Sequence, residues 1–144
     1  MNEALSCILN RRSVRAYRPE QISDTELEAI LRAGLYAPTA MNRQSPIMLV
    51  IQDKETISML SGMNAKVMGL DTDPFYGAPT VIVVLADKNI PTYVQDASLV
   101  MGNMMNAAFA LGVDSCWINR AREVFEMPEA RALLRDCLLY TSPS

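Results

Sequence analysis

Residues 79–86, with the sequence PTVIVVLA, form the clearest strand pattern in the chain. After an initial proline, the residues from Val81 to Ala86 are all apolar, and most of them are β-branched. A continuous run of this kind predicts a strand that is covered on both faces. The nearly apolar segment from Ile47 to Gln52 predicts a second short buried strand. The order in which the strands pair is left open by the sequence.

Helical patterns surround these strands. The first helix is expected at residues 2–10, and a second opens at the capping box Ser23-Asp24-Thr25-Glu26. Asp53 can cap a third helix that runs from Lys54 to about Met68. A further strand is predicted at Val113–Ile118 and a last helix at Arg122–Arg135. Because strands and helices alternate, the pattern predicts a layered α+β or α/β fold.

Residues 93–111 predict one long helix with an unusual composition. Asp96 is its one ionisable residue, and its other positions are rich in alanine, methionine and small residues. Gly112 is well placed to end the helix. A helix that is apolar on most sides lies in a core or at an interface.

Composition excludes several classes of site. The chain has no histidine, which removes histidine-based triads and imidazole metal ligands. Its three cysteines are Cys7, Cys116 and Cys137, and their spacing predicts neither a zinc site nor a disulfide framework. We expect reduced thiols in a cytoplasmic protein, with Cys7 and Cys116 buried. The net charge of −3 argues against nucleic-acid binding, and the apolar runs are too short to cross a membrane.

A basic cluster follows the first predicted helix. Arg11, Arg12, Ser13 and Arg15 place three guanidinium groups and one hydroxyl within five residues. Arginine donates paired, charge-assisted hydrogen bonds, so the cluster is suited to a phosphate group. Arginines at a helix C-terminus also favour its dipole without any ligand. These residues alone leave both interpretations open.

A polar loop separates the second predicted helix from the strand at Ile47. Its sequence, APTAMNRQSP at residues 37–46, carries one proline near each end. Asn42 and Gln44 each offer both donors and an acceptor, which can read the edge of a heteroaromatic ring. The alternative interpretation is a plain loop made of turn-forming residues.

Taken together, four segments resemble the nitroreductase family, in its order and at its approximate spacing. They are RRSVR at 11–15, APTAMNRQ at 37–44, Ala78-Pro79 before a strand, and LGVDSCWI at 111–118. The resemblance extends from about Glu3 to Leu134. It implies a three-layer α/β/α sandwich of the α+β class, with a mostly antiparallel central sheet. The long helix at 93–111 would be the family's central dimer-packing helix.

The resemblance also implies a cofactor and a reaction. Members of the family bind FMN noncovalently in homodimers, with both chains contributing to each site. Arg11, Ser13 and Arg15 would hold its phosphate and ribityl end, Arg12 would act mainly through its backbone, and Asn42 and Gln44 would lie near the ring. Hydride would pass from NAD(P)H through the flavin to an electron-poor acceptor such as a nitroaromatic or quinone. The protein itself would need no catalytic residue, because the cofactor carries the chemistry.

Other conspicuous residues are expected to be structural. Trp117 and Cys116 could touch the flavin, but a strand position favours packing in the core. Ser45 stands between Gln44 and Pro46, where many relatives place the proline directly after the glutamine. We therefore expect a small shift at this end of the loop.

The C-terminal residues depart from the family pattern. Relatives continue into another strand and an arm with a basic residue near the flavin phosphate, and residues 136–144 match neither. We expect residues 1–135 to form the FMN-binding domain without that strand and arm, and residues 136–144 to be a non-family tail. The alternative function is therefore a non-catalytic fragment that binds flavin or another phosphate ligand.

Overall fold

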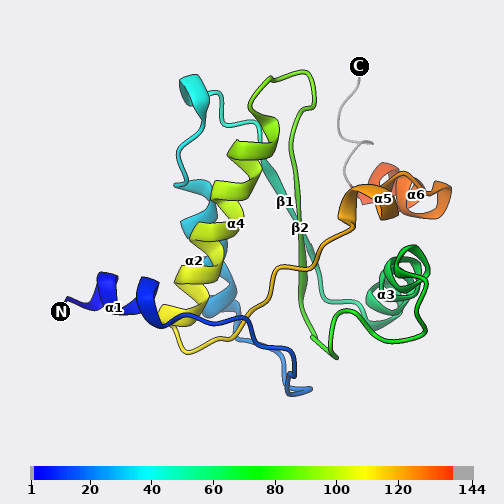
Figure 1. The fold of residues 1–144 in the computed structure, drawn as a ribbon, viewed down its shortest axis with the longest axis horizontal. Coiled ribbons are helices and arrows are strands. Elements are labelled where there is room, and N and C mark those ends of the chain that lie inside the picture. Colours follow the sequence, from blue (N-terminus) through cyan, green and yellow to red (C-terminus); the bar gives the residue numbers. More distant parts are fainter. Residues whose placement is uncertain (1, 138–144) are drawn as a thin grey trace.

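A computed structural model describes residues 2–137 as a three-layer α+β structure (Figure 1). The middle layer is an antiparallel sheet of β1 (Ile47–Ile51) and β2 (Val81–Leu85). On one side lie α1 (Glu3–Asn10), α2 (Asp24–Leu35) and α4 (Tyr93–Ala110). On the other side lie α3 (Lys54–Met68), α5 (Ala121–Phe125) and α6 (Pro128–Cys137).

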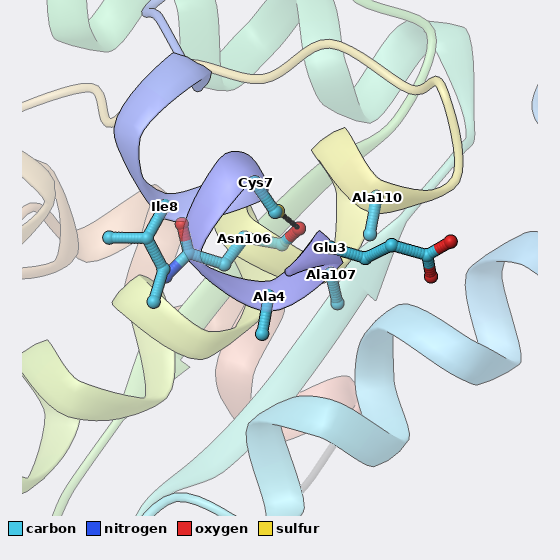
Figure 2. Close-up of a pocket in the computed structure, with 7 residues that line it drawn as sticks. All are labelled: Glu3, Ala4, Cys7, Ile8, Asn106, Ala107 and Ala110. Atoms are coloured by element: carbon cyan, nitrogen blue, oxygen red, sulfur yellow. Dashed lines mark hydrogen bonds between the residues drawn. The ribbon is translucent and has the colours of Figure 1, made fainter. Parts of the chain in front are cut away.

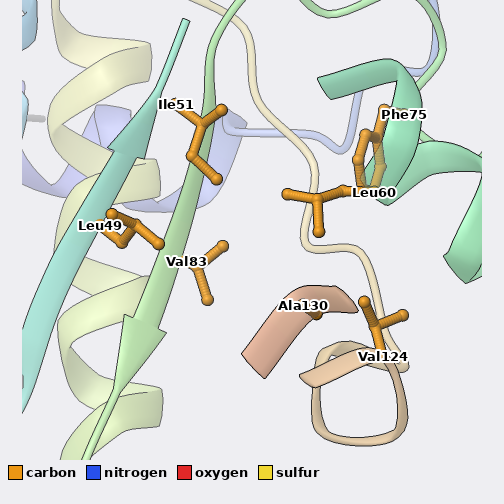
Figure 3. Packing of buried hydrophobic residues seen from close by; sticks show 7 residues of the cluster. All are labelled: Leu49, Ile51, Leu60, Phe75, Val83, Val124 and Ala130. Atoms are coloured by element: carbon orange, nitrogen blue, oxygen red, sulfur yellow. The ribbon is translucent and has the colours of Figure 1, made fainter. Parts of the chain in front are cut away.

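The sheet is covered on both faces, as its continuous apolar strands predict. Leu49 pairs with Val83, and both side chains belong to the cluster that packs toward α3, α5 and α6 (Figure 3). Their neighbours Met48 and Ile82 pack instead with the cluster on α2 and α4. This alternation is the period of two that strands impose on side chains. The sheet therefore separates two apolar clusters, one in each helical layer.

Local signals in the sequence explain where the helices begin and end. The Ser23 hydroxyl accepts a hydrogen bond from Glu26 N, and the Glu26 carboxylate accepts one from Ser23 N, so the predicted capping box forms. Asp53 caps α3 in the same way through Thr56 N. Gly112 follows the end of α4 with φ of 77°, a left-handed conformation that glycine adopts without steric cost.

α2 and α4 pack closely at Gly34. A Cβ atom at this position would lie 2.9 Å from Met104 Cγ and 2.9 Å from Met48 Sδ. Met104 itself is buried in the core. A glycine is thus needed here to let the two helices and β1 approach.

Two predicted elements differ from the structure. Residues 113–118 form no strand: a single parallel bridge joins Ser115 to Ser13, and no second pair extends it. The expected helix at 122–135 is divided into α5 and α6 at Pro128, which has no N–H group to continue a helix and begins a new one.

Three burial predictions are also wrong. Cys7 and Cys116 are partly exposed rather than buried. Trp117 is 48% exposed, because the segment that carries it runs over the molecule instead of entering the sheet.

α6 reaches Cys137, two residues past the predicted domain boundary, and residues 138–144 of the predicted tail lie outside the described residues.

Candidate functional site

The basic segment from Arg11 to Arg15 leaves the end of α1 and runs beside the segment that follows α4. The Cys7 thiol donates to the carbonyl of Asn106 on α4, at 3.1 Å, and so attaches α1 to that helix. Val14 N then donates to Ser115 O at 3.0 Å, next to the bridge between Ser13 and Ser115. These long-range contacts fix the backbone of the basic segment near the C-terminal end of α4.

The four polar residues of this segment differ in what their side chains do. Arg12 Nη1 donates to Leu9 O and Arg11 O, both at 2.8 Å, so its guanidinium group closes the end of α1. Arg11 Nη1 is buried and has no hydrogen-bond partner, alone among the buried side-chain nitrogen and oxygen atoms of residues 2–137. The side chains of Ser13 and Arg15 are exposed. An unpaired buried donor is costly, and an anion would satisfy it.

Tyr17 is bonded to the backbone of the same segment. Its hydroxyl donates to Val14 O. Burial raises the pKa of Tyr17 to about 12, with smaller contributions from Cys116 and Asp114. The phenol therefore stays neutral where it supports the backbone beside Arg15.

The loop that contains Asn42 and Gln44 has an unusual backbone. Ala40–Asn42 form the short helix η1, and Met41, Asn42 and Gln44 have φ values of 55°, 55° and 57°. Gln44 N donates to Thr39 Oγ1 at 3.0 Å, and Gln44 Nε2 donates to Asn42 Oδ1 at 2.7 Å. Left-handed conformations are uncommon for residues other than glycine, and asparagine tolerates them best. The loop thus brings both predicted amides together, exposed on one surface.

Ser45 also has a role in this loop. Its hydroxyl accepts a hydrogen bond from Asp87 N at 2.9 Å, which ties the loop's end to the segment after β2. Pro46 then leads directly into β1.

Asp96 is a residue of this region that the sequence did not assign to the site. It is 2% exposed in the first turn of α4, and it accepts from Ala40 N and Thr92 Oγ1, both at 3.0 Å. A single carboxyl group in an otherwise uncharged helix was the available signal. Nothing in the sequence indicated that its partner would be a backbone amide 56 residues away.

The two groups of candidate residues lie toward opposite ends of α4 (Figure 1). The loop at 39–44 is bonded to Asp96, whereas the basic segment is bonded to Ser115 and follows α1, whose Cys7 is bonded to Asn106. A rise of 1.5 Å per residue places Asp96 about 20 Å from the end of α4 at Ala110. One chain therefore does not bring Arg11, Ser13 and Arg15 together with Asn42 and Gln44.

Apolar side chains are exposed along the same helical layer. Leu5, Ile8 and Leu9 of α1 are 50%, 58% and 56% exposed, although their spacing is that of a packed helix face. An open groove of about 340 Å³ lies between α1 and α4, with Ile8 and Ala110 among its lining residues (Figure 2). This exposed face of α1 is therefore one that another apolar surface could cover.

Residues 2–137 contain neither a membrane-spanning helix nor a cluster of metal-ligating side chains. No helix in this range combines the length and the hydropathy required to cross a bilayer. The same range contains no group of three or more histidine, cysteine, aspartate or glutamate residues arranged to hold a metal ion.

Comparison with known proteins gives a consistent result. The sequence profile described as "Nitroreductase family" matches residues 8–70 and 64–133. A protein of Archaeoglobus fulgidus, named "Putative NADH dehydrogenase/NAD(P)H nitroreductase", is 36% identical over 96% of this chain and 77% of its own.

Solved structures agree with the sequence relatives. A nitroreductase with bound FMN from Bacteroides fragilis has a TM-score of 0.87 and 33% identity, over 94% of this chain and 80% of that one. A nitroreductase with bound FMN from Desulfitobacterium hafniense has a TM-score of 0.84 and 28% identity, with the same coverage of both chains.

Proposed function

The chain belongs to the nitroreductase family, and on that basis we propose that it is an FMN-dependent NAD(P)H oxidoreductase that reduces electron-poor acceptors such as nitroaromatics and quinones. The single observation in this chain that carries the proposal is the buried, unpartnered Nη1 atom of Arg11. It lies in the segment expected to bind the cofactor phosphate. A phosphate oxygen would supply the acceptor that this donor lacks.

The residues present fit the phosphate end of FMN. Arg11 would donate from its buried Nη1, and Ser13 and Arg15 would donate from exposed side chains. Arg12 would contribute its backbone, since its side chain is already bonded to the end of α1. Charge-assisted bonds of this kind are roughly twice as strong as neutral ones.

The residues of the loop fit the ring end. Asn42 and Gln44 present amide groups that can donate to and accept from the polar edge of an isoalloxazine ring. When bound, FMN supplies hydride transfer, and the protein supplies binding, orientation and the polar environment. No protein acid is required, because water can supply the proton.

The distance between the two groups supports a homodimer. The phosphate and the ring of FMN are joined by a short ribityl chain, which does not span the length of α4. Each cofactor would therefore contact the basic segment of one chain and the loop of its partner. The exposed apolar faces of α1 and α4, with Leu9, Val94 and Leu99, would be covered in the same assembly. A cytoplasmic location remains a prediction.

The first experiment is the visible absorption spectrum of the full chain, purified after FMN is supplied and then removed from solution. We expect retained flavin bands and a mass of two chains by light scattering. Colourless monomeric protein would contradict the proposal.

The second experiment measures NAD(P)H oxidation with a quinone and with a nitroaromatic compound. We expect oxidation to depend on the acceptor. A dimer that retains flavin without oxidising NAD(P)H would favour the non-catalytic alternative.

A further inference from the structure

We infer that Asp96 is a positioning residue, which holds the loop at 39–44 in the conformation that presents Asn42 and Gln44 to the flavin ring. That Asp96 orders the loop is inferred from the geometry of this chain. That the ordered loop serves flavin binding rests on the proposed function. Asp96 touches neither candidate amide directly. It acts through the backbone at Ala40, immediately before the residues with left-handed conformations.

The carboxylate of Asp96 joins the loop to α4 and is nearly inaccessible to solvent. Oδ1 accepts from Ala40 N and Oδ2 accepts from Thr92 Oγ1. Within residues 2–137 it forms no ion pair, since the pair found there joins Arg122 to Glu126. A buried charge without a counterion is costly unless hydrogen bonds compensate for it. The position of Asp96 near the N-terminus of α4 also lowers that cost through the helix dipole.

The loop needs such an attachment because its backbone is strained. Met41, Asn42 and Gln44 all have positive φ, and residues held in sparsely populated conformations persist only where surrounding contacts determine them. Several internal bonds connect the loop to itself, among them those from Gln44 to Thr39 and to Asn42 and the backbone bond from Asn42 N to Thr39 O. Asp96 connects its start, and Ser45 connects its end, to other elements. Of the side-chain bonds, the one to Asp96 is partly buried, whereas those of Gln44 and Ser45 are exposed.

The consequence concerns how the flavin ring is recognised. A preordered loop binds its ligand without first losing conformational freedom, so removing the attachment should weaken FMN binding. It should also make the loop accessible to protease in the absence of FMN. Arg43 lies inside the loop and its side chain is exposed, so trypsin cleavage after Arg43 measures the order of the loop directly.

The experiment compares Asp96→Ala, Asp96→Asn and the unchanged full chain, each prepared without FMN. Ser98→Ala is the matched control, because the Ser98 hydroxyl donates only within α4, to Val94 O. Cleavage after Lys66 in α3 serves as the internal reference for general unfolding. FMN affinity is then measured for each protein by quenching of flavin fluorescence.

We expect Asp96→Ala to raise cleavage after Arg43 by roughly tenfold without a matching rise at Lys66, and to weaken FMN binding by roughly tenfold, as loss of a buried hydrogen bond implies. Asp96→Asn should restore most of both properties, since its amide oxygen can still accept from Ala40 N. If Asp96→Ala does not fold, Thr92→Val removes the hydroxyl that orients the carboxylate and should raise cleavage after Arg43 by about threefold.

Cleavage after Arg43 that is unchanged, or that rises only together with cleavage after Lys66, would overturn the inference. A disordered loop with unaltered FMN affinity would overturn its flavin part. If the unchanged protein binds no FMN, the proposed function fails, while the cleavage comparison still decides whether Asp96 orders the loop.

Discussion

The two ends of α4 differ in how far the chain satisfies its own hydrogen bonds. At the start of α4, the buried carboxylate of Asp96 and the hydroxyl of Ser45 attach the loop at 39–44 to other elements, and Gln44 is bonded to Thr39 within it. Near its end, the backbone of the basic segment is fixed, but Arg11 Nη1 is left buried and unpartnered. The loop at the start of α4 is ordered by the protein's own hydrogen bonds, whereas the basic segment near its end has a donor without a partner.

This difference matches the two parts of the proposed cofactor. A flavin ring is rigid and needs its recognition groups in one orientation, so an ordered loop suits it. A phosphate supplies several strong acceptors, so arginine donors can remain unpaired until it binds. The cost of an unpaired donor falls on the protein without ligand, and the benefit appears in the complex.

The largest expected effect is at Arg11. Arg11→Met keeps an apolar stem but removes the guanidinium group, and should weaken FMN binding by roughly tenfold to a hundredfold, as loss of charge-assisted bonds worth about 1.5–3 kcal/mol implies. The FMN-free protein should be no less stable in urea, because a buried donor without a partner is removed.

Arg12→Met is the control for this change. The Arg12 side chain is bonded to the end of α1, so FMN affinity should hardly change while the stability of the FMN-free protein falls slightly. Equal losses of affinity in the two variants would remove the distinction between the arginines.

The second prediction tests the close packing of α2 against α4, the helix that separates the two groups of candidate residues. Gly34→Val places new atoms against Met104 and Met48, and should lower the free energy of unfolding by about 1–3 kcal/mol, as overpacking does. Gly62→Val is the control, since no atom outside its own helix lies within 4 Å of a Cβ at that position in α3. Urea unfolding measures both, and a Gly34→Val protein as stable as the control would contradict the close packing.

Most of the framework was predictable from the sequence, for reasons visible in particular residues. The capping box at Ser23 and the cap at Asp53 fix helix starts through local bonds. The apolar runs at Ile47 and Val81 fix the strands, because only a covered sheet buries them. The long pattern from Tyr93, uncharged apart from Asp96, predicts α4. Each signal acts over a few residues.

What the sequence did not predict depends on contacts between distant residues. The segment at 113–118 has a strand-like composition, but its neighbour at Ser13 offers one pairing position, so Trp117 stays exposed. The break between α5 and α6 is an exception, because Pro128 is a local signal for it. In the candidate site, Asn42 and Gln44 were singled out by their amide groups together with the family resemblance, and their place near the flavin ring stays a prediction. The role of Asp96 required the tertiary structure, because Ala40 has no side-chain chemistry to indicate it.

The third prediction concerns Asn42. Asn42→Ala and Asn42→Gly both remove the amide, and each should weaken FMN binding by about tenfold, in line with one or two neutral hydrogen bonds. Only the alanine is strained at φ of 55°, so it should also destabilise the FMN-free protein by roughly 1 kcal/mol relative to glycine. If affinity falls in the alanine protein alone, the backbone and not the amide is what FMN requires.

The smallest effect on stability is expected at Tyr17, whose hydroxyl is already bonded to the backbone of the basic segment. Burial raises its pKa to about 12 from an ordinary value of 10.0, so above pH 10 the folded state keeps a proton that the unfolded state releases. The stability that this shift contributes is complete below pH 10 and is lost as pH rises through about 12.

Tyr17→Phe removes the titrating group together with its bond to Val14 O. The unfolding free energies of the two proteins should therefore differ by a constant at neutral pH and converge above pH 10. Parallel curves over the whole range would mean that the phenol is as exposed to solvent in the folded chain as in the unfolded one, and that the basic segment lacks this support.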